Sequence, residues 1–89
     1  MNSRTTRAFR DALAELPLDI RRHAREAYRR FQQDPKHPGL RFKKVHDTKP
    51  IYSVRVGIDH RAVGALRGDT IIWFWCGSHD EYDKLLKRL

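Results

Sequence analysis

A small group of side chains in the sequence could bind a phosphate and move a proton. In the segment Ile51–Gly57, the alternation of a β-strand would place Ser53 and Arg55 on one face and the apolar residues on the other. Arg61 follows just after the next turn, so its guanidinium group could join that of Arg55. A charged residue in the middle of a strand usually has a partner or a ligand. Arg55 and Arg61 are therefore our first candidates for phosphate binding.

Two neighbouring lysines are further candidates for the same role. Lys43 and Lys44 lie in the preceding segment, Leu40–His46, which also has the composition of a strand. Consecutive residues of a strand point to opposite faces, so only one of the two lysines can share a face with Arg55. The alternation alone does not distinguish between them.

His79 and Tyr82 are candidates for proton transfer. They lie three residues apart, on one side of a predicted C-terminal helix. The N-terminus of a helix disfavours a positive charge, so a neutral His79 could accept a proton there, and the free amides of that helix end favour a phosphate. Both residues also have simpler interpretations, because Tyr82 continues the apolar stripe of the helix and His79 could be an ordinary surface residue.

The sequence lacks the motifs of the common cofactor-dependent and metal-dependent proteins. It has no glycine-rich phosphate loop, no paired cysteines at zinc spacing, no nucleophile elbow and no HExxH motif. The five histidines are spread over different predicted elements, and Asp80 and Asp83 are most simply the exposed acidic start of a helix. We therefore expect neither a metal nor a cofactor.

The charge of the chain indicates what kind of partner it has. Nineteen Lys and Arg residues against eleven Asp and Glu residues give a formal net charge of +8, which attracts anions and above all nucleic acid. No apolar run approaches the roughly 20 residues needed to span a bilayer, and the first residues lack the apolar stretch of a signal peptide. The single cysteine, Cys76, cannot form an internal disulfide. We expect a cytoplasmic protein without a membrane partner.

Eighty-nine residues suit a single domain, and its N-terminal part has the hydrophobic period of helices. Pro17 divides this part into two amphipathic helices, which we expect to form an antiparallel hairpin. Their apolar positions are Ala8, Phe9, Ala12, Leu13 and Leu16, then Ile20, Ala24, Ala27, Tyr28 and Phe31. The other face of the second helix carries Arg21, Arg22, Arg25, Arg29 and Arg30. Long basic side chains routinely solvate such a face, so we favour general attraction of nucleic acid over a dedicated contact surface.

The period changes to that of strands after the turn-rich segment Asp34–Gly39. Four strands are predicted, at Leu40–His46, Ile51–Gly57, Arg61–Leu66 and Thr70–Cys76. The short gaps between them favour an antiparallel meander. The last strand is apolar without alternation, which predicts cover on both faces and favours core packing of Trp73 and Trp75 over stacking on bases.

A capping-box pattern at 78–81 begins the closing helix at His79. Its apolar stripe consists of Tyr82, Leu85, Leu86 and Leu89. The predicted fold class is α+β, with an N-terminal helical hairpin, a four-stranded antiparallel sheet and a C-terminal helix.

These elements, in this order, resemble the RelE/ParE toxin superfamily over nearly the whole chain. The resemblance rests on Tyr-Ser-Val-Arg-Val-Gly at 52–57, His-Arg-Ala-Val-Gly at 60–64, Gly-Ser-His at 77–79 and Asp-Glu-Tyr-Asp-Lys-Leu-Leu at 80–86. It implies one RelE-like domain over 1–89, in which the sheet cradles RNA in a basic concave face. Relatives commonly begin with a β-strand, but the few residues before the first helix leave room only for a shortened strand or none.

The resemblance also implies a function. The chain would be the toxin of a type II toxin–antitoxin system, and an acidic or amphipathic antitoxin would cover its basic face. Many members of the family cut messenger RNA on the ribosome without a metal, by attack of a ribose 2′-hydroxyl on the adjacent phosphate. His79 or Tyr82 would then transfer protons. The residues that would bind and neutralise the phosphate are Arg55, Arg61, and Lys43 or Lys44.

Two other functions fit the same pattern. The family includes non-enzymatic gyrase poisons with the same fold, whose growth arrest would survive replacement of His79 and Tyr82. Charge alone would suit a basic nucleic-acid-binding module without toxicity, which predicts salt-sensitive binding and no growth defect. The presence of both His79 and Tyr82 favours the endoribonuclease.

Overall fold

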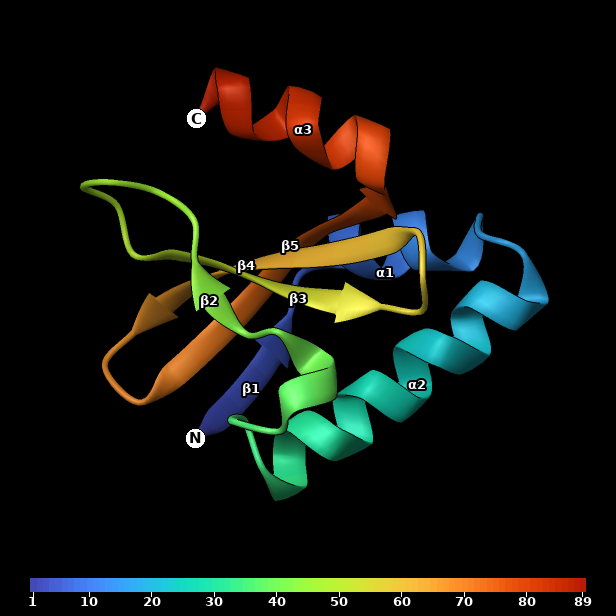
Figure 1. Cartoon of the computed structure of the whole chain (residues 1–89), viewed down its shortest axis with the longest axis horizontal. Helices are drawn as coiled ribbons and strands as arrows, with labels where there is room; N and C mark the ends of the chain where they lie inside the picture. Colours follow the sequence, from blue (N-terminus) through green and yellow to red (C-terminus); the bar gives the residue numbers. More distant parts are fainter.

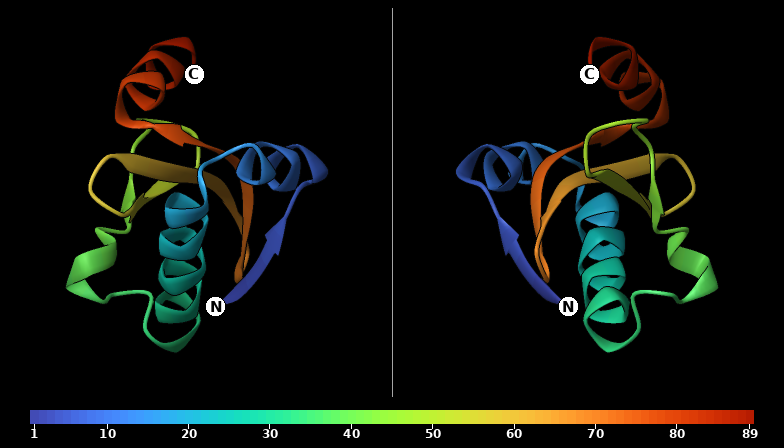
Figure 2. Two further views of the ribbon diagram at one scale, coloured as in Figure 1. Left: turned by 90° about the vertical axis from the view of Figure 1, so that its right-hand side faces the viewer. Right: turned by 90° about the vertical axis from the view of Figure 1, so that its left-hand side faces the viewer.

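The computed structural model of residues 1–89 contains three helices and one five-stranded sheet (Figure 1). The elements in chain order are β1 (Asn2–Thr5), α1 (Arg7–Ala14), α2 (Leu18–Gln33), a 3₁₀ turn η1 (Pro38–Leu40), β2 (Lys43–Lys44), β3 (Ile51–Val56), β4 (His60–Arg67), β5 (Thr70–Ser78) and α3 (His79–Arg88). The helices α1 and α2 cover one face of the sheet, and α3 lies on the other (Figure 2). The α+β class is that predicted from the sequence. None of the three helices has both the length and the apolar character needed to cross a membrane.

The strands are arranged in the order β1-β5-β4-β3-β2. The strands β2 to β5 form the predicted antiparallel meander. The strand β1 is added at the edge of β5 and runs parallel to it, with Asn2 opposite Thr70 and Thr5 opposite Trp73. The indole nitrogen of Trp73 donates a hydrogen bond of 3.0 Å to Ser3 Oγ and helps to hold β1 in place. The N-terminal strand is therefore shortened but present.

The strand predicted at Leu40–His46 is mostly absent. Pro38 begins a 3₁₀ turn, and Arg41 then adopts a left-handed backbone conformation with φ 49°. A residue with positive φ cannot continue an extended strand, so the chain reaches β3 only at Lys43 and Lys44. Leu40, only 2% exposed, packs into the core instead.

The larger core lies between the sheet and the helices α1 and α2. Its buried members are Phe9, Ala27, Phe31, Leu40, Val54, Val56, Ala62, Ile71 and Trp73. Phe31 lies near its centre and makes edge-to-face contacts with Phe42 and Trp73, at ring-centroid distances of 5.1 and 5.4 Å. The helix α1 packs on β5 and α2 packs on β3, with almost no contact between the two helices. The predicted helical hairpin is thus present, but its two arms are splayed apart.

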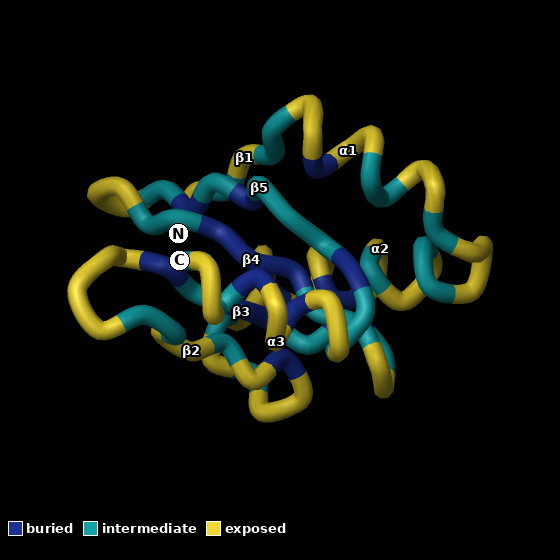
Figure 3. The backbone as a smooth tube through the Cα atoms, turned by 90° about the horizontal axis from the view of Figure 1, so that it is seen from above, coloured by how far each residue is buried: buried dark blue, intermediate teal, exposed yellow.

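A smaller core lies between the sheet and α3, and its buried members are Ile51, Val63, Tyr82 and Leu85. A β-bulge between the pairs of Val63 and Gly64 shifts the alternation in β5. Trp73 therefore faces α1 and α2, whereas Phe74 and Trp75 pack on the side of α3. This explains why the strand is apolar without alternation, and Figure 3 shows the buried middle of the sheet between the exposed helices and turns.

The closing helix begins as its sequence predicts. The Oγ atom of Ser78 accepts a hydrogen bond of 3.2 Å from the backbone nitrogen of Glu81. A carboxylate oxygen of Glu81 in turn accepts a bond of 3.0 Å from the backbone nitrogen of Ser78. This reciprocal capping box fixes the start of α3 at His79, directly after β5.

Candidate phosphate-binding site

Arg55 and Arg61 are direct cross-strand partners in β3 and β4. Side chains of directly opposed residues lie on the same face of a sheet, about 5 Å apart at their Cβ atoms. Arg61 is also opposite Gly77 in β5, so the three residues form one row across the sheet. The neighbouring row contains Ser53 and Val63, which lie against α3. The strand register therefore directs both arginines outward from the α3 face, as the alternation of Ser53 and Arg55 predicts. Arg55, however, also lines a pocket with His23 and Glu26 of α2, at the open edge of β3.

Neither arginine has an acidic partner, because both ion pairs of the structure involve other residues. Each guanidinium group is instead held by a nearby main-chain carbonyl. Nε of Arg55 donates a bond of 3.0 Å to the carbonyl oxygen of Gly57, and Nη1 of Arg61 donates one of 2.8 Å to that of His60. Like charges directly opposite one another destabilise a sheet. An anion that accepted hydrogen bonds from the remaining N–H groups would relieve this repulsion.

The register of β2 distinguishes the two lysines. Lys43 is opposite Ser53, and Lys44 is opposite Tyr52. Lys43 thus shares the face of Ser53 and Arg55, whereas Lys44 points to the opposite side of the sheet. Both lysines are exposed. Only Lys43 is placed to extend the cationic face.

Tyr82 lies beneath this face. It is 6% exposed, and its hydroxyl group donates a bond of 3.1 Å to Oγ of Ser53, which is 2% exposed. Its aromatic ring belongs to the core under α3. The sequence left open whether Tyr82 is a proton-transfer group or a core aromatic residue, and the structure gives it the contacts of a core residue with a satisfied hydroxyl group.

His79 has the opposite character, since its side chain is 42% exposed. Nδ1 of the imidazole lies 3.3 Å from a carboxylate oxygen of Asp83, one turn further along α3. The ring also makes an edge contact with Tyr82 at a centroid distance of 5.8 Å. The carboxylate of Asp83 thus lies beside Nδ1, and Nε2 has no hydrogen-bond partner within the protein. The sequence favoured an exposed position for Asp83 at the start of the helix, but its i,i+4 spacing from His79 was the signal of this contact.

The end of β5 lies beside the arginine row, and α3 begins directly after β5, so the start of α3 lies beside this row as well. Arg61 is opposite Gly77, and His60 is opposite Ser78, the residue that caps α3. Gly77 is required for this approach, since a Cβ atom there would lie 2.8 Å from the ring of Trp75 and 3.1 Å from a carboxylate oxygen of Glu81. The fold thus brings Arg55, Arg61 and the N-terminus of α3 to one end of the sheet.

The remaining titratable groups offer less chemistry. No group of three or more His, Cys, Asp or Glu side chains lies together in a metal-binding arrangement. Burial, with a smaller contribution from the charge of Glu81, raises the pKa of the Cys76 thiol to about 11. A thiol with so high a pKa is protonated at neutral pH and is a poor nucleophile.

Comparison with known protein families gives one match, which covers most of the chain. The family model described as the ParE-like toxin domain matches residues 18–84. Among curated protein sequences there is no significant relative.

Several solved structures share the fold. A chain of the RelB–RelE antitoxin–toxin complex from Methanococcus jannaschii is 22% identical, with 92% of this chain and 96% of that chain covered and a TM-score of 0.74. A chain of the archaeal RelE–RelB complex from Pyrococcus horikoshii OT3 is 18% identical, with 88% and 93% covered and a TM-score of 0.69. The isolated E. coli RelE toxin is 12% identical, with 98% and 96% covered and a TM-score of 0.67.

Proposed function

The chain belongs to the ParE-like toxin domain family, and from this premise we propose that it is the toxin of a type II toxin–antitoxin system that cleaves messenger RNA without a metal. One observation carries the ribonuclease proposal. Arg55 and Arg61 are direct cross-strand partners in β3 and β4, and neither forms an ion pair with a carboxylate. Such a pair suits a ligand with concentrated negative charge, and the RNA backbone supplies one at every nucleotide.

In the proposed reaction, a ribose 2′-oxygen attacks the adjacent phosphorus atom. A new bond forms between these two atoms, and the bond from phosphorus to the 5′-oxygen of the next nucleotide breaks. The products are a 2′,3′-cyclic phosphate and a free 5′-hydroxyl group. Arg55, Arg61 and Lys43 would neutralise the charge that develops on the phosphate oxygens during the attack.

His79 is the proposed proton-transfer residue, because its imidazole is accessible and Asp83 holds it at Nδ1. Nε2 would either take the proton from the 2′-hydroxyl group, with solvent water protonating the leaving 5′-oxygen, or protonate that oxygen, with solvent water accepting the 2′-hydroxyl proton. Tyr82 would position His79, since the two rings are in contact and the hydroxyl group of Tyr82 is bonded to Ser53. We propose that this chemistry takes place on messenger RNA at the ribosome, in the cytoplasm.

We further propose that a protein antitoxin holds the toxin inactive. Two structural neighbours are chains of RelB–RelE complexes, which are assemblies of an antitoxin with its toxin. The net charge of +8 favours an acidic partner.

The test is inducible expression of the wild type beside an Arg61→Ala/His79→Ala variant, with growth and transcript ends followed together. The wild type should stop growth and produce cut transcripts that primer extension detects, and the double variant should do neither at the same protein level. Arg22→Ala is the matched control, because it removes an exposed arginine on α2, away from the α3 face, and should behave as the wild type.

The main alternative is a non-enzymatic, ParE-like poison of gyrase, and the match to the ParE-like toxin domain is the observation that favours it. In that case growth would stop while transcripts stayed intact, a DNA damage response would appear, and the His79→Ala variant would remain toxic. A chain that binds nucleic acid but never impairs growth would instead be a non-toxic binding module.

A further inference from the structure

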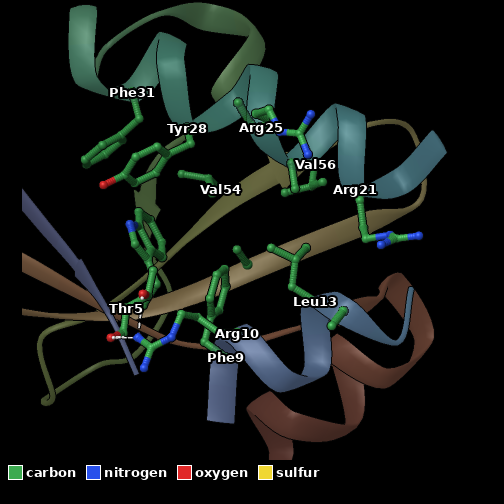
Figure 4. Close-up of a pocket in the computed structure, with 15 residues that line it drawn as sticks. Thr5, Phe9, Arg10, Leu13, Arg21, Arg25, Tyr28, Phe31, Val54 and Val56 are labelled. Carbon is green, nitrogen blue, oxygen red and sulfur yellow. Dashed lines mark hydrogen bonds between the residues drawn. The ribbon is translucent and has the colours of Figure 1, made fainter. Parts of the chain in front are cut away.

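A small polar pocket of about 250 Å³ lies at the open edge of β3. It is on a different side of α2 from the apolar cleft that Figure 4 shows, into which Arg25 and Tyr28 point. The pocket exists because β2 pairs only with Tyr52 and Ser53, so the end of β3 has no strand beside it. The polar side chains that line it are those of His23, Glu26, Arg30 and Arg55.

The charged groups of this pocket border the same space without pairing. Glu26 has an arginine one turn away on either side, at Arg22 and Arg30, which is the spacing at which ion pairs form on a helix. It nevertheless forms no ion pair, and neither does Arg30 or Arg55. One carboxylate and two guanidinium groups therefore keep their hydrogen-bonding groups available for a ligand.

The turn after β3 gives the pocket a fixed wall. Nε of Arg55 donates a bond of 3.0 Å to the carbonyl oxygen of Gly57, and its two terminal nitrogens have no partner in the protein. Gly57 has φ 62°, and a Cβ atom there would lie 2.7 Å from Nδ1 of His23. The glycine thus allows the imidazole ring of His23 to pack directly on the turn that holds Arg55. An imidazole ring is a surface on which a nucleobase can stack.

The donors and acceptors of the pocket match one nucleobase. Guanine has two adjacent N–H donors, at N1 and N2, on one edge, and two adjacent acceptors, O6 and N7, on another. A single carboxylate can accept from both donors, and a single guanidinium group can donate to both acceptors. No other base of RNA presents both of these pairs.

We propose that this pocket binds the guanine base of a nucleotide whose phosphate contacts Arg55. Glu26 accepts the hydrogen bonds from N1 and N2, Arg30 donates to O6 and N7, and His23 stacks on the ring. A volume of about 250 Å³ is below the roughly 300–1,000 Å³ of pockets that hold drug-sized ligands, which suits a single base.

This inference rests on the proposed function for the source of the base, which is then a residue of the messenger RNA beside the cleaved phosphate. It adds a preference for guanine. The pair of Arg55 and Arg61 alone provides none, because contacts to phosphate carry no sequence information. A free guanine nucleotide would offer the same base and phosphate, so the binding experiment includes one.

The probes are the single-stranded RNAs AAGAAA and AAAAAA and free 5′-GMP, titrated into the His79→Ala chain so that no RNA is cut. AAGAAA should bind about tenfold or more tightly than AAAAAA, although the two carry the same charge. Inosine in place of the guanosine removes the N2 donor, and 7-deazaguanosine removes the N7 acceptor. Each should weaken binding about fivefold or more. Backbone NMR shifts should map the guanine to the middle of α2 and to Gly57.

Two variants test the pocket directly, both built on His79→Ala. Glu26→Gln and Arg30→Met should each reduce the preference for AAGAAA to less than about threefold. Glu15→Gln and Arg29→Met are the matched controls, because they make the same changes at exposed positions outside the pocket, and they should keep the preference. Thermal unfolding checks that each variant is folded.

Several results would overturn the inference: equal binding of the two RNAs, unchanged affinity for the inosine and 7-deazaguanosine RNAs, equal loss in the control variants, or NMR shifts confined to α3. If GMP bound as tightly as AAGAAA, the guanine pocket would stand and its ligand would be a free nucleotide. The ribonuclease is tested separately with the His79 chain. A chain that prefers guanine without cutting RNA would keep the pocket and lose the ribonuclease, and one that cuts RNA without the preference would do the reverse.

Discussion

The two faces of the sheet differ in the side chains that the same strand presents to them. In β3, Val54 and Val56 point toward α1 and α2 and enter the larger core, while Ser53 points toward α3. Arg55 lies at the open edge of the strand, where it lines a pocket with residues of α2. The core on the first face has nine buried residues, and the core on the second has four. One face therefore provides most of the burial, and the other retains polar and charged groups near the surface.

The difference follows from the lengths and positions of the covering helices. The helix α2 has 16 residues and α3 has 10, which correspond to about 24 and 15 Å of helix. Because α3 begins directly after β5 and packs over Val63 and Ile51, the row of Arg55, Arg61 and Gly77 lies at its N-terminal end. Because this short helix starts at the end of a strand, it covers the smaller core and leaves the row of arginines beside that core uncovered.

The largest expected effect concerns the two cores. Phe31→Ala should lower the free energy of unfolding by about 3–5 kcal/mol, because it removes the ring that contacts Phe42 and Trp73. Leu85→Ala, on the buried side of α3, should lower the free energy of unfolding by about 2–3 kcal/mol, toward the lower end for a buried leucine. Urea denaturation measures both values, and a larger loss for Leu85→Ala would reverse the division of stability between the faces.

A smaller effect is expected at Tyr82, where the core of α3 meets the proposed site. Tyr82→Phe should cost about 1–2 kcal/mol of stability, because it leaves the buried hydroxyl group of Ser53 without its partner. RNA cleavage should stay within about threefold of the wild type, whereas His79→Ala should lower it by about 100-fold. If Tyr82→Phe instead lost cleavage as severely as His79→Ala, its hydroxyl group would be a proton-transfer group.

The smallest effect concerns the start of α3. Hydrogen bonds from the backbone and then the side chain of Ser78 lower the pKa of Glu81 from its ordinary value of 4.5. Because the folded state has the lower pKa, the capping box adds stability above about pH 4.5 and loses it as the pH falls through the lowered value. Glu81→Gln should flatten the dependence of stability on pH in this range by about 0.5 kcal/mol or less.

The matched control for this prediction is Asp80→Asn, which removes a charge from the same helix end and leaves the capping box intact. Urea denaturation between about pH 3 and pH 6, in steps of about half a pH unit, gives the free energy of unfolding of both variants for this comparison. Equal pH profiles for the two variants would mean that the capping box adds nothing beyond the general charge of the helix terminus.

The sequence determined those features that depend on neighbouring residues of the chain. The alternation of β3 predicted that Ser53 and Arg55 share a face, and the capping pattern at 78–81 predicted the start of α3. The hydrophobic period predicted both N-terminal helices and the antiparallel meander. These signals are reliable because backbone geometry fixes the side-chain period of helices and strands.

Only the tertiary structure decided how distant segments meet. The register of β2 against β3 selected Lys43 over Lys44, and the packing of α3 placed the hydroxyl group of Tyr82 on Ser53. The left-handed conformation of Arg41 shortened β2, and the packing of α1 on β5 and of α2 on β3 held the two helices apart. A local pattern carries the direction of a side chain relative to its own backbone. It carries no information on the partner that side chain meets across the sheet, because that depends on the free energy of packing segments far apart in the chain.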